Sequence, residues 1–276
     1  MTATSFPARL HVLVARDAPV GVVIRRGPSK ATALVGWNRQ DDTFAPGQWL
    51  CGHIYERRSD LSPDGRHLIY FAMNGRWKSE ARGSWTAISR APYLKALTLY
   101  AKGDCWNGGG LFRDAQRYWL NEGFYAHELL RDEAPLRRVD DTHRPHGECP
   151  AIYYERLARD GWTAAEQRPD GRGDRVLALD KPLSARWLLR KYAHATLCPG
   201  PGRGCYYDTH ELVDRQDGTT LLRDHWEWAD LVDGRLVWAS RGCLRAADIA
   251  SGGSLGEERL LHDFNPMAFE AVRAPY

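Results

Sequence analysis

The hydrophobic residues of this chain lie in short runs that are separated by turn-forming residues. Each run is five to seven residues long and is bordered by Gly, Pro, Asp or Asn, as at 11–15, 20–24, 31–37, 67–73 and 94–100. This pattern is typical of β-strands. The region 129–141 leaves room for only a turn or two of helix, because Pro135 interrupts it. We therefore expect an all-β fold, and the density of short strands favours a sandwich, a barrel or a propeller.

One hairpin pattern occurs twice in the sequence. Residues 59–75 read SDLSPDGRHLIYFAMNG, and residues 229–242 read ADLVDGRLVWASRG. Both contain a small residue followed by Asp-Leu, an Asp-Gly pair, a basic residue, an apolar strand and a closing glycine. Asp-Gly tolerates the positive φ angles that a tight two-residue hairpin turn requires. Self-similarity of this kind indicates a repeat architecture.

The spacing of hairpin-like segments predicts the number of repeats. Such segments begin near 12, 60, 109, 177 and 229, with one longer interval that holds a loop insertion near 131–150. An interval of about 50 residues accommodates the four strands of a propeller blade. We therefore expect residues 1–276 to form a single β-propeller domain, with five blades of four antiparallel strands. If the repeat interval is shorter than about 50 residues, the alternative is a propeller of six or seven blades. Residues 260–269 would supply the last strands, and the N-terminal segment would lend a strand to the final blade to close the ring.

The first copy of the repeat carries a family resemblance. Residues 61–72, LSPDGRHLIYFA, resemble the repeat of TolB-like and WD40-like β-propellers. The resemblance implies that Ser-Pro-Asp-Gly forms the turn between the innermost strand of a blade and the next strand. It covers about a tenth of the chain, and the Trp-Asp dipeptide of the WD40 repeat is missing. Propellers serve as scaffolds, lectins and enzymes, so function has to be argued from particular residues.

The charge, the hydropathy and the cysteines of the chain indicate which classes of partner and which compartment to expect. The chain has 38 basic and 35 acidic residues, and its formal charge of +3 is too small for a dedicated nucleic-acid-binding protein. No apolar run is long enough to span a membrane, and the N-terminus lacks the pattern of a signal peptide. We expect a cytoplasmic protein with reduced thiols, without a cofactor and without nucleic-acid or membrane partners.

Several aromatic and basic residues fall in loop-like sequence. The chain has 11 tryptophans, and three of them lie beside Gly, Asn or Lys: Trp77, Trp85 and Trp106. Arg203 lies in the Pro/Gly-rich segment CPGPGRGC. Trp and Arg are the side chains that most often anchor protein interfaces. We therefore interpret the protein as a non-catalytic binding or scaffold module that recognises a protein partner through a loop face, and a small-molecule or glycan ligand remains open.

The alternative function is a hydrolase that acts on a glycan or a small anionic substrate in the central funnel. Some five-bladed propellers are glycoside hydrolases, and these need two carboxyl groups about 5 to 9 Å apart. The candidates are Asp60, Asp104, Glu227 and Asp230. Because Asp60 and Asp230 occupy matching positions of the repeat, a repeated structural role explains them as well as catalysis does.

A metal site has weaker support. His143, His146 and Cys149 lie close together in HRPHGEC, at a spacing that could supply three zinc ligands. A fourth ligand would have to come from elsewhere, such as Cys198, Cys205 or His210. Structural zinc sites usually consist of two tight pairs of ligands, whereas Pro145 and Gly147 favour a simple exposed insertion here. We therefore expect no bound metal.

Overall fold

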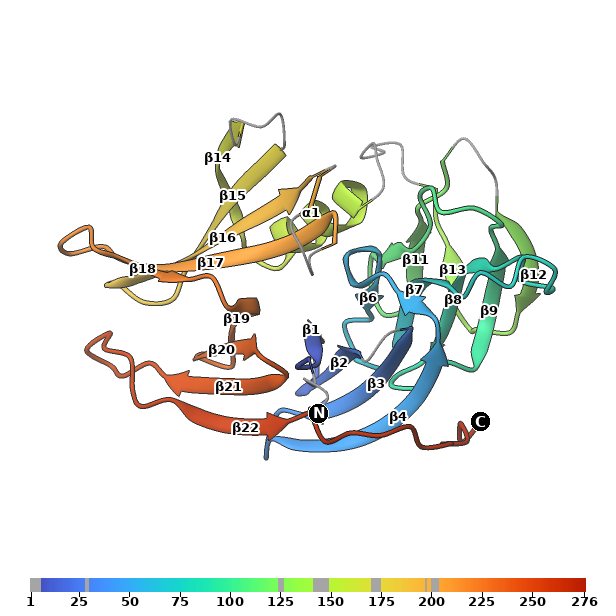
Figure 1. Ribbon diagram of the computed structural model, residues 1–276, viewed down its shortest axis with the longest axis horizontal. Helices are drawn as coiled ribbons and strands as arrows, with labels where there is room; N and C mark the ends of the chain where they lie inside the picture. Colours follow the sequence, from blue (N-terminus) through green and yellow to red (C-terminus); the bar gives the residue numbers. More distant parts are fainter. Residues whose placement is uncertain are drawn as a thin grey trace, which may run out of the picture. The chain divides into compact units, whose positions relative to one another are not determined.

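The computed structural model describes residues 6–27, 30–123, 127–140, 149–169, 175–196, 198–199 and 204–276. The described strands form five sheets, so the expected all-β fold is confirmed. The chain divides into two compact units (Figure 1). Unit 1 comprises Met1–Phe6, His11–Arg156 and Met267–Tyr276, and unit 2 comprises Pro7–Leu10 and Leu157–Pro266.

Sheet 1 consists of four strands in sequence order, joined by tight connections. They are β1 (Arg9–Val14), β2 (Val20–Arg26), β3 (Ala31–Asn38) and β4 (Thr43–Cys51). The hairpin expected within residues 11–24 is therefore present, because β1 lies beside β2. The runs of Val, Ile and Leu in β2 and β3 are almost completely buried, as expected for strands packed on both faces.

Sheet 2 contains the first copy of the repeat. Its order is β12-β9-β8-β7-β5, and β6 also pairs with β7. The strands are β5 (His53–Ile54), β6 (Asp60–Leu61), β7 (His67–Met73), β8 (Ser84–Arg90), β9 (Ala96–Ala101) and β12 (Glu128–Asp132), and a short 3-10 helix, η1 (Glu56–Arg58), separates β5 from β6. The Ser-Pro-Asp-Gly turn joins β6 to β7: Gly65 N donates to Ser62 O at 2.8 Å, and Gly65 has a φ of 71°.

Sheet 3 is small, and its strands are β10 (Gly110–Phe112), β11 (Arg117–Leu120) and β13 (Arg137–Arg138). β13 lies parallel to β11. Part of the region 129–141 therefore forms β12 and β13, and the turn or two of helix considered there is absent. The one α-helix in the described part of the chain, α1 (Cys149–Arg159), was not predicted. The expected insertion near 131–150 thus begins with strand residues, and its segment 141–148 lies outside the described residues.

Unit 2 contains sheets 4 and 5, each with its strands in sequence order. Sheet 4 is formed by β14 (Thr163–Pro169), β15 (Arg175–Pro182), β16 (Trp187–Ala195), β17 (Tyr206–Asp214) and β18 (Thr220–Arg223), and sheet 5 by β19 (Trp226–Val232), β20 (Arg235–Ser240), β21 (Cys243–Asp248) and β22 (Arg259–Asp263). Val232 pairs with Arg235, so Asp233 and Gly234 form the predicted two-residue turn, with φ angles of 49° and 73°.

The prediction that the N-terminal segment lends a strand to the last sheet is wrong for the described residues. Sheet 5 is completed by β22, which pairs with β21, and takes no strand from the N-terminal segment. The nearest described N-terminal strand, β1, lies beside β2 instead. Within unit 2, the N-terminal segment is instead attached by a single hydrogen bond, in which Ala8 N donates to the side chain of Asn265 at 2.9 Å.

Three outermost strands share a short sequence that lies outside the repeated hairpin pattern. β12 reads ELLRD, β22 reads RLLHD, and β18 with the next residue reads TLLRD. Each strand forms the edge of its own sheet. One or both leucines of each pair are exposed, as at Leu129, Leu222 and Leu260. The charged residues around the leucines are typical of edge strands that resist further pairing.

The C-terminal segment is fixed to unit 1 by its last residue. The Tyr276 hydroxyl accepts a hydrogen bond from Arg90 N at 3.1 Å and donates one to Lys95 O at 2.6 Å. The Tyr276 ring lies near the side chains of Arg90 and Lys95, at distances typical of cation–π contacts. The connection between β8 and β9 is therefore a docking point for the end of this chain.

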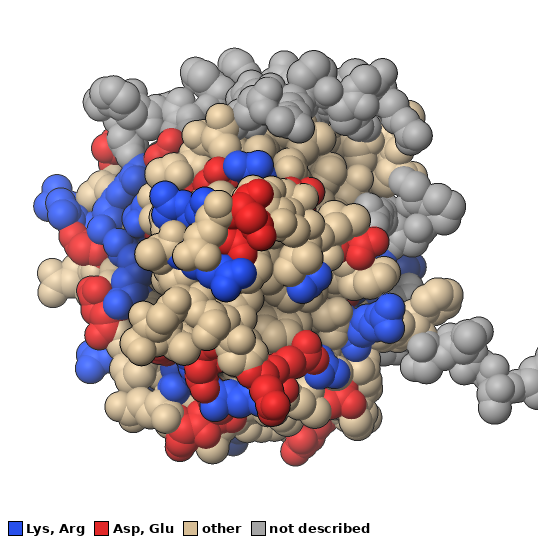
Figure 2. All heavy atoms as spheres, turned by 90° about the vertical axis from the view of Figure 1, so that its left-hand side faces the viewer, with Lys and Arg blue, Asp and Glu red and all other residues tan. Residues whose placement is uncertain are grey.

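The surface carries charges of both signs. Figure 2 shows Lys and Arg interspersed with Asp and Glu on the face that it displays. This agrees with the formal charge of +3. Within the described residues, no helix has the length and apolar character needed to cross a membrane.

Candidate functional site

Two loops lie side by side at one end of sheet 2. The first, 74–83, joins β7 to β8, and the second, 102–109, joins β9 to β10. Lys102 N donates to Ser84 O at 2.9 Å, and the Ser84 hydroxyl donates to Asp104 O at 2.6 Å. These bonds hold the second loop against Ser84, the first residue of β8, which directly follows the first loop. We call five of their exposed side chains the aromatic platform: Arg76, Trp77, Lys78, Arg82 and Trp106. The carboxylate of Glu80 is exposed on the first loop as well.

The Trp77 indole rests on the backbone of Gly83. A Cβ atom built at Gly83 would lie 2.5 Å from Cε3 of Trp77 and 2.9 Å from Cδ2, so only glycine permits this contact. Gly83 also has a φ of 78°, which glycine adopts without strain. Trp77 nevertheless remains 55% exposed. The backbone therefore supports the indole while leaving much of it open to solvent.

Trp106 is exposed on a loop that a buried cation holds from within. Trp106 is 56% exposed. Arg58 is almost fully buried, and its Nη1 donates to Cys105 O at 2.8 Å and to Asn107 O at 2.5 Å. The Arg58 guanidinium also lies over the rings of Tyr55 and Phe71. Because the carbonyls on both sides of Trp106 are fixed, this part of the loop is ordered before any partner binds.

A second buried cation, Lys102, neutralises Asp104 at the base of the platform. The Lys102 ammonium lies 2.8 Å from the Asp104 carboxylate, and the lysine side chain has no exposed surface. The same carboxylate accepts a hydrogen bond from Trp106 N at 2.8 Å. Asp104 is thus a structural link between the buried lysine and the exposed tryptophan.

His127 lies behind the same loop in neutral form. Gly109 N donates to the Thr86 hydroxyl at 2.8 Å, and that hydroxyl lies 3.1 Å from Nε2 of His127. Whether Nε2 of His127 donates or accepts in this contact depends on the ring tautomer, and Nδ1 is buried without a hydrogen-bond partner among the described residues. Burial, reinforced by the charge of Lys102, lowers the pKa of His127 to about 4. His127 therefore carries no charge at neutral pH.

Arg82 spans both loops and the outermost strand. Its Cβ would lie 3.5 Å from a Cβ built at Gly103, and its guanidinium forms an ion pair with Glu128 of β12. The positive charge of Arg82 is therefore matched by a carboxylate. Arg76 and Lys78 differ, since neither forms an ion pair with a carboxylate in the described part of the chain.

The other predicted binding residues do not join the platform. Trp85 lies on β8, where it is only partly exposed and packs against the core between sheets 1 and 2. Arg203 lies outside the described residues, as do His143 and His146. Cys149 is the first residue of α1, and burial raises the pKa of its thiol. The described residues contain no group of three potential metal ligands.

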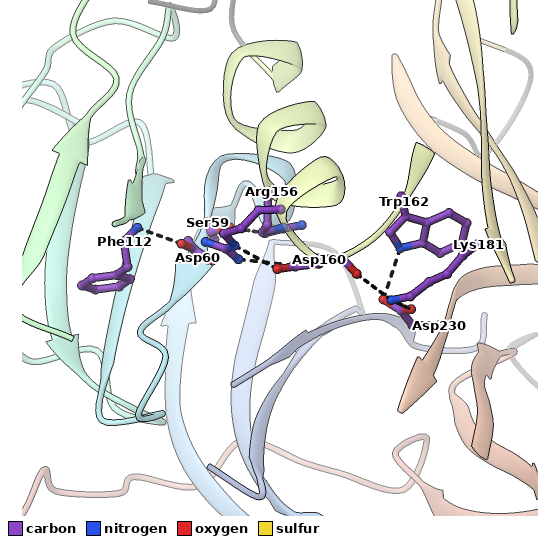
Figure 3. A network of polar contacts seen from close by, with 9 residues as sticks. Ser59, Asp60, Phe112, Arg156, Asp160, Trp162, Lys181 and Asp230 are labelled. Atoms are coloured by element: carbon purple, nitrogen blue, oxygen red, sulfur yellow. Dashed lines mark hydrogen bonds and ion pairs between the residues drawn. The ribbon is translucent and has the colours of Figure 1, made fainter. Parts of the chain in front are cut away.

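Of the predicted catalytic carboxylates, Asp60 and Glu227 bind backbone N–H groups. Asp60 is buried, and its Oδ2 accepts from Phe112 N at 2.8 Å, which ties sheet 2 to sheet 3 within unit 1 (Figure 3). Glu227 Oε2 accepts from Leu10 N at 2.8 Å within unit 2. Both carboxylates therefore have clear structural roles.

Asp230 connects two sheets of unit 2 through a lysine. Its Oδ1 lies 2.5 Å from Lys181 Nζ, and its Oδ2 lies 3.4 Å from Trp162 Nε1 (Figure 3). Lys181 also donates to Asp160 O at 2.8 Å. Asp60 and Asp230, which occupy matching positions of the repeat, thus each connect two sheets. Asp60 does so through a backbone N–H group, and Asp230 does so through a lysine side chain.

A buried polar cluster in unit 2 escaped the sequence analysis. Lys191 and His210 face each other across β16 and β17, and both are almost fully buried. The Lys191 ammonium lies 4.7 Å from the centre of the Trp162 ring and 3.8 Å from Asp208. His210 Nδ1 donates to Trp226 O at 3.0 Å, whereas Nε2 has no hydrogen-bond partner among the described residues. Burial, with the charge of Lys191, lowers the pKa of His210 to about 3.

Comparison with known proteins gives no functional assignment. No family model matches the sequence, and no curated protein is significantly similar to it. Function is therefore argued from the side chains alone.

Proposed function

We propose that this chain is a binding module that recognises a protein partner through the aromatic platform of unit 1. The observation that carries the proposal is the pair Trp77 and Trp106, each more than half exposed and each held on an ordered loop. Exposed tryptophans that are fixed in advance lose little conformational entropy on binding and make effective anchors. Arg82, which spans the two loops, adds a planar cation to the same surface.

The bonding of the four candidate carboxylates favours binding over hydrolysis. A glycoside hydrolase needs an acid and a base or nucleophile that both reach the substrate. Here Asp60 and Glu227 accept backbone N–H groups, and Asp104 and Asp230 are paired with lysines. Each carboxylate has a role in holding the fold, so catalysis is not needed to explain any of them.

Affinity purification of the tagged full-length chain from its native cells tests the proposed function. Three forms are compared by quantitative mass spectrometry: the wild type, the Trp77→Ala/Trp106→Ala variant, and a Leu222→Ala/Leu260→Ala control that removes exposed apolar surface elsewhere. We expect a protein bound in stoichiometric amounts by the wild type and the control and absent from the tryptophan variant. Equal retention by all three forms would contradict the proposal. Urea unfolding of each form checks that it is folded.

We also propose that the five sheets are the blades of one β-propeller. In its support, sheets 1, 4 and 5 each keep their strands in sequence order, and three sheets end in the same LL(R/H)D strand. Among the described residues only sheets 1 and 5 have the expected four strands: sheet 2 has six strands, sheet 4 has five, and sheet 3 has three, of which β13 is parallel to β11. Two carboxylates accept hydrogen bonds from backbone N–H groups of strands outside their own sheet. Asp60 of β6 accepts from Phe112 N of β10, and Glu227 of β19 accepts from Leu10 N of β1.

Small-angle X-ray scattering of the full chain tests the propeller. A single compact body of this length has a radius of gyration of about 19 Å and one maximum in its distance distribution. Two separately moving units would give a larger radius and a second maximum or a long tail, which would contradict the ring.

We infer a cytoplasmic location from the thiols. All six cysteines are free, and four of them are exposed. Exposed free thiols persist in a reducing compartment. Fractionation of cells that express the tagged chain at native level tests this, and recovery in an exported fraction would contradict it.

A further inference from the structure

We propose that the partner segment recognised by the aromatic platform is acidic and carries a large apolar side chain. This inference rests on the proposed function and specifies the chemistry of the partner. The two exposed indoles supply an apolar contact surface, and the charges around them determine which sequences are attracted to it.

The platform has an excess of positive charge once its ion pairs are removed. Arg82 is paired with Glu128, and Lys102 is paired with Asp104. The exposed ions that remain on the first loop are Arg76 and Lys78 against the single carboxylate of Glu80. Arg76 and Lys78 are also the sequence neighbours of Trp77, so both cations belong to the same loop segment as this exposed indole.

The loop that carries these cations is ordered by its own backbone. Arg76 N donates to the Asn74 side chain at 2.9 Å, Ser79 N donates to Arg76 O at 2.9 Å, and Arg82 N donates to Ser79 O at 2.9 Å. Successive turns therefore fix the path of the chain on both sides of Trp77. The two cations are attached to a defined backbone. The surface therefore combines apolar contact area with fixed positive charge.

A peptide fits this surface better than a nucleic acid does. Binding to the backbone of a nucleic acid depends on lysines and arginines that neutralise its phosphates, and each neutralised phosphate adds to the affinity through counterion release. The platform offers only Arg76 and Lys78 without a carboxylate partner, and the formal charge of the whole chain is +3. Two cations beside two indoles match a short segment that carries one or two carboxylates and an aromatic or aliphatic anchor.

Selection from a library of random dodecapeptides, displayed on phage, tests the inference. The wild-type chain is used for selection, and Trp77→Ala/Trp106→Ala is used to remove peptides that bind elsewhere. Affinities of the recovered peptides are then measured by fluorescence anisotropy. The test variant is Arg76→Glu/Lys78→Glu, and the matched control is Arg16→Glu/Arg215→Glu, which makes the same charge change at other exposed arginines.

We expect the recovered peptides to be rich in Asp and Glu and to contain a large apolar residue. Their affinity should fall roughly threefold to thirtyfold in Arg76→Glu/Lys78→Glu and stay unchanged in the control. Salt should weaken binding to the wild type between about 50 and about 300 mM NaCl, because exposed charges are screened.

Three outcomes would overturn the inference. Peptides that require the tryptophans but are neutral or basic, or that ignore the charge reversal, would leave the proposed function standing and refute the acidic partner. Failure to recover any peptide that requires the tryptophans would count against both. Tighter binding of a single-stranded oligothymidylate than of the best peptide, lost in the charge-reversed variant, would assign the platform to nucleic acid instead.

Discussion

Gly83 and Gly75 provide a matched pair of substitutions for testing how Trp77 is held. Both glycines lie in the same loop with left-handed backbone angles, φ 78° and φ 72°. A Cβ built at Gly83 would lie 2.5 Å from the Trp77 ring, whereas a Cβ built at Gly75 meets no atom within 4 Å. Alanine at either position therefore introduces the same backbone strain, and only alanine at Gly83 displaces the indole.

The magnitudes follow from these two contributions. Placing an L-residue in the left-handed region costs about 1 to 2 kcal/mol, so both variants should lose that much free energy of unfolding. Because Trp77 is exposed, its ring can move away from alanine at Gly83 with little further loss of stability. Loss of one well-placed tryptophan anchor from an interface costs about 2 kcal/mol or more, which is roughly thirtyfold in affinity. Gly83→Ala should therefore weaken partner binding by that factor, while Gly75→Ala should not.

Urea unfolding gives the stability of both variants, and fluorine NMR of protein labelled with fluorotryptophan reports the position of the indole. The Trp77 resonance is assigned from its absence in Trp77→Phe. We expect this resonance to shift in Gly83→Ala and to keep its position in Gly75→Ala. An unchanged resonance in Gly83→Ala, or equal shifts in both variants, would refute the contact between Trp77 and Gly83.

Three further predictions concern the stability of the fold. Asp60→Ala should lower the free energy of unfolding by about 1 to 3 kcal/mol, because the buried N–H of Phe112 loses its acceptor. Asp60→Asn keeps an oxygen and should lose less stability. Equal losses of the two variants in urea unfolding would contradict this role of Asp60. The lowered pKa values of His127 and His210 mean that, below about pH 6.5, the unfolded chain takes up protons that the folded chain does not. Acidification from about pH 7 to about pH 5 should therefore destabilise the protein, with a slope of up to about 1.4 kcal/mol per pH unit for each histidine, and a constant urea midpoint would be inconsistent with neutral buried rings. Tyr276→Ala should release the C-terminal segment and speed hydrogen exchange in the connection between β8 and β9, while Tyr276→Phe should have a smaller effect, since it keeps the ring contacts.

Local sequence signals predicted the strands and one of the two Asp-Gly turns. The apolar runs became β1, β2, β3 and β7, and Asp233-Gly234 forms the predicted two-residue turn. These features depend on side-chain alternation and on backbone angles that glycine allows, so neighbouring residues suffice to identify them. The prediction of a two-residue turn at Asp64-Gly65 is wrong, because this pair lies in a longer turn in which Ser62 N donates to His67 O and only Gly65 of the pair has a positive φ. Closure of the sheets into a ring depends on distant contacts and stays a prediction.

Helix α1 carried a signal that was overlooked. Its buried residues Cys149, Ile152, Tyr153 and Leu157 follow a helical spacing. The Pro/Gly-containing segment that precedes the helix obscures this pattern in the sequence. Trp85 also carried a local signal, because it belongs to the strand-like run Ser84–Arg90, in which residues pack on both faces.

The supports of the aromatic platform had no local signal. Arg58 holds the carbonyls of residues 105 and 107, which lie far along the chain, and Lys102 looks like any surface lysine in the sequence. Trp77 and Trp106 were singled out because they lie beside loop-forming residues, and both are exposed. The sequence thus identified two of the three selected tryptophans correctly as exposed, whereas the buried cations that order their loops depend on tertiary contacts.

Site-specific photocrosslinking tests the central claim most directly. A benzophenone amino acid is placed at Trp77, at Trp106 or, as the control, at the exposed Leu222 of β18, and the full chain is irradiated in its native cells. The account predicts one shared protein adduct from the two platform positions and no such adduct from the control. The same adduct from Leu222, or the absence of an adduct from both platform positions, would contradict the claim that these two loops form the binding surface.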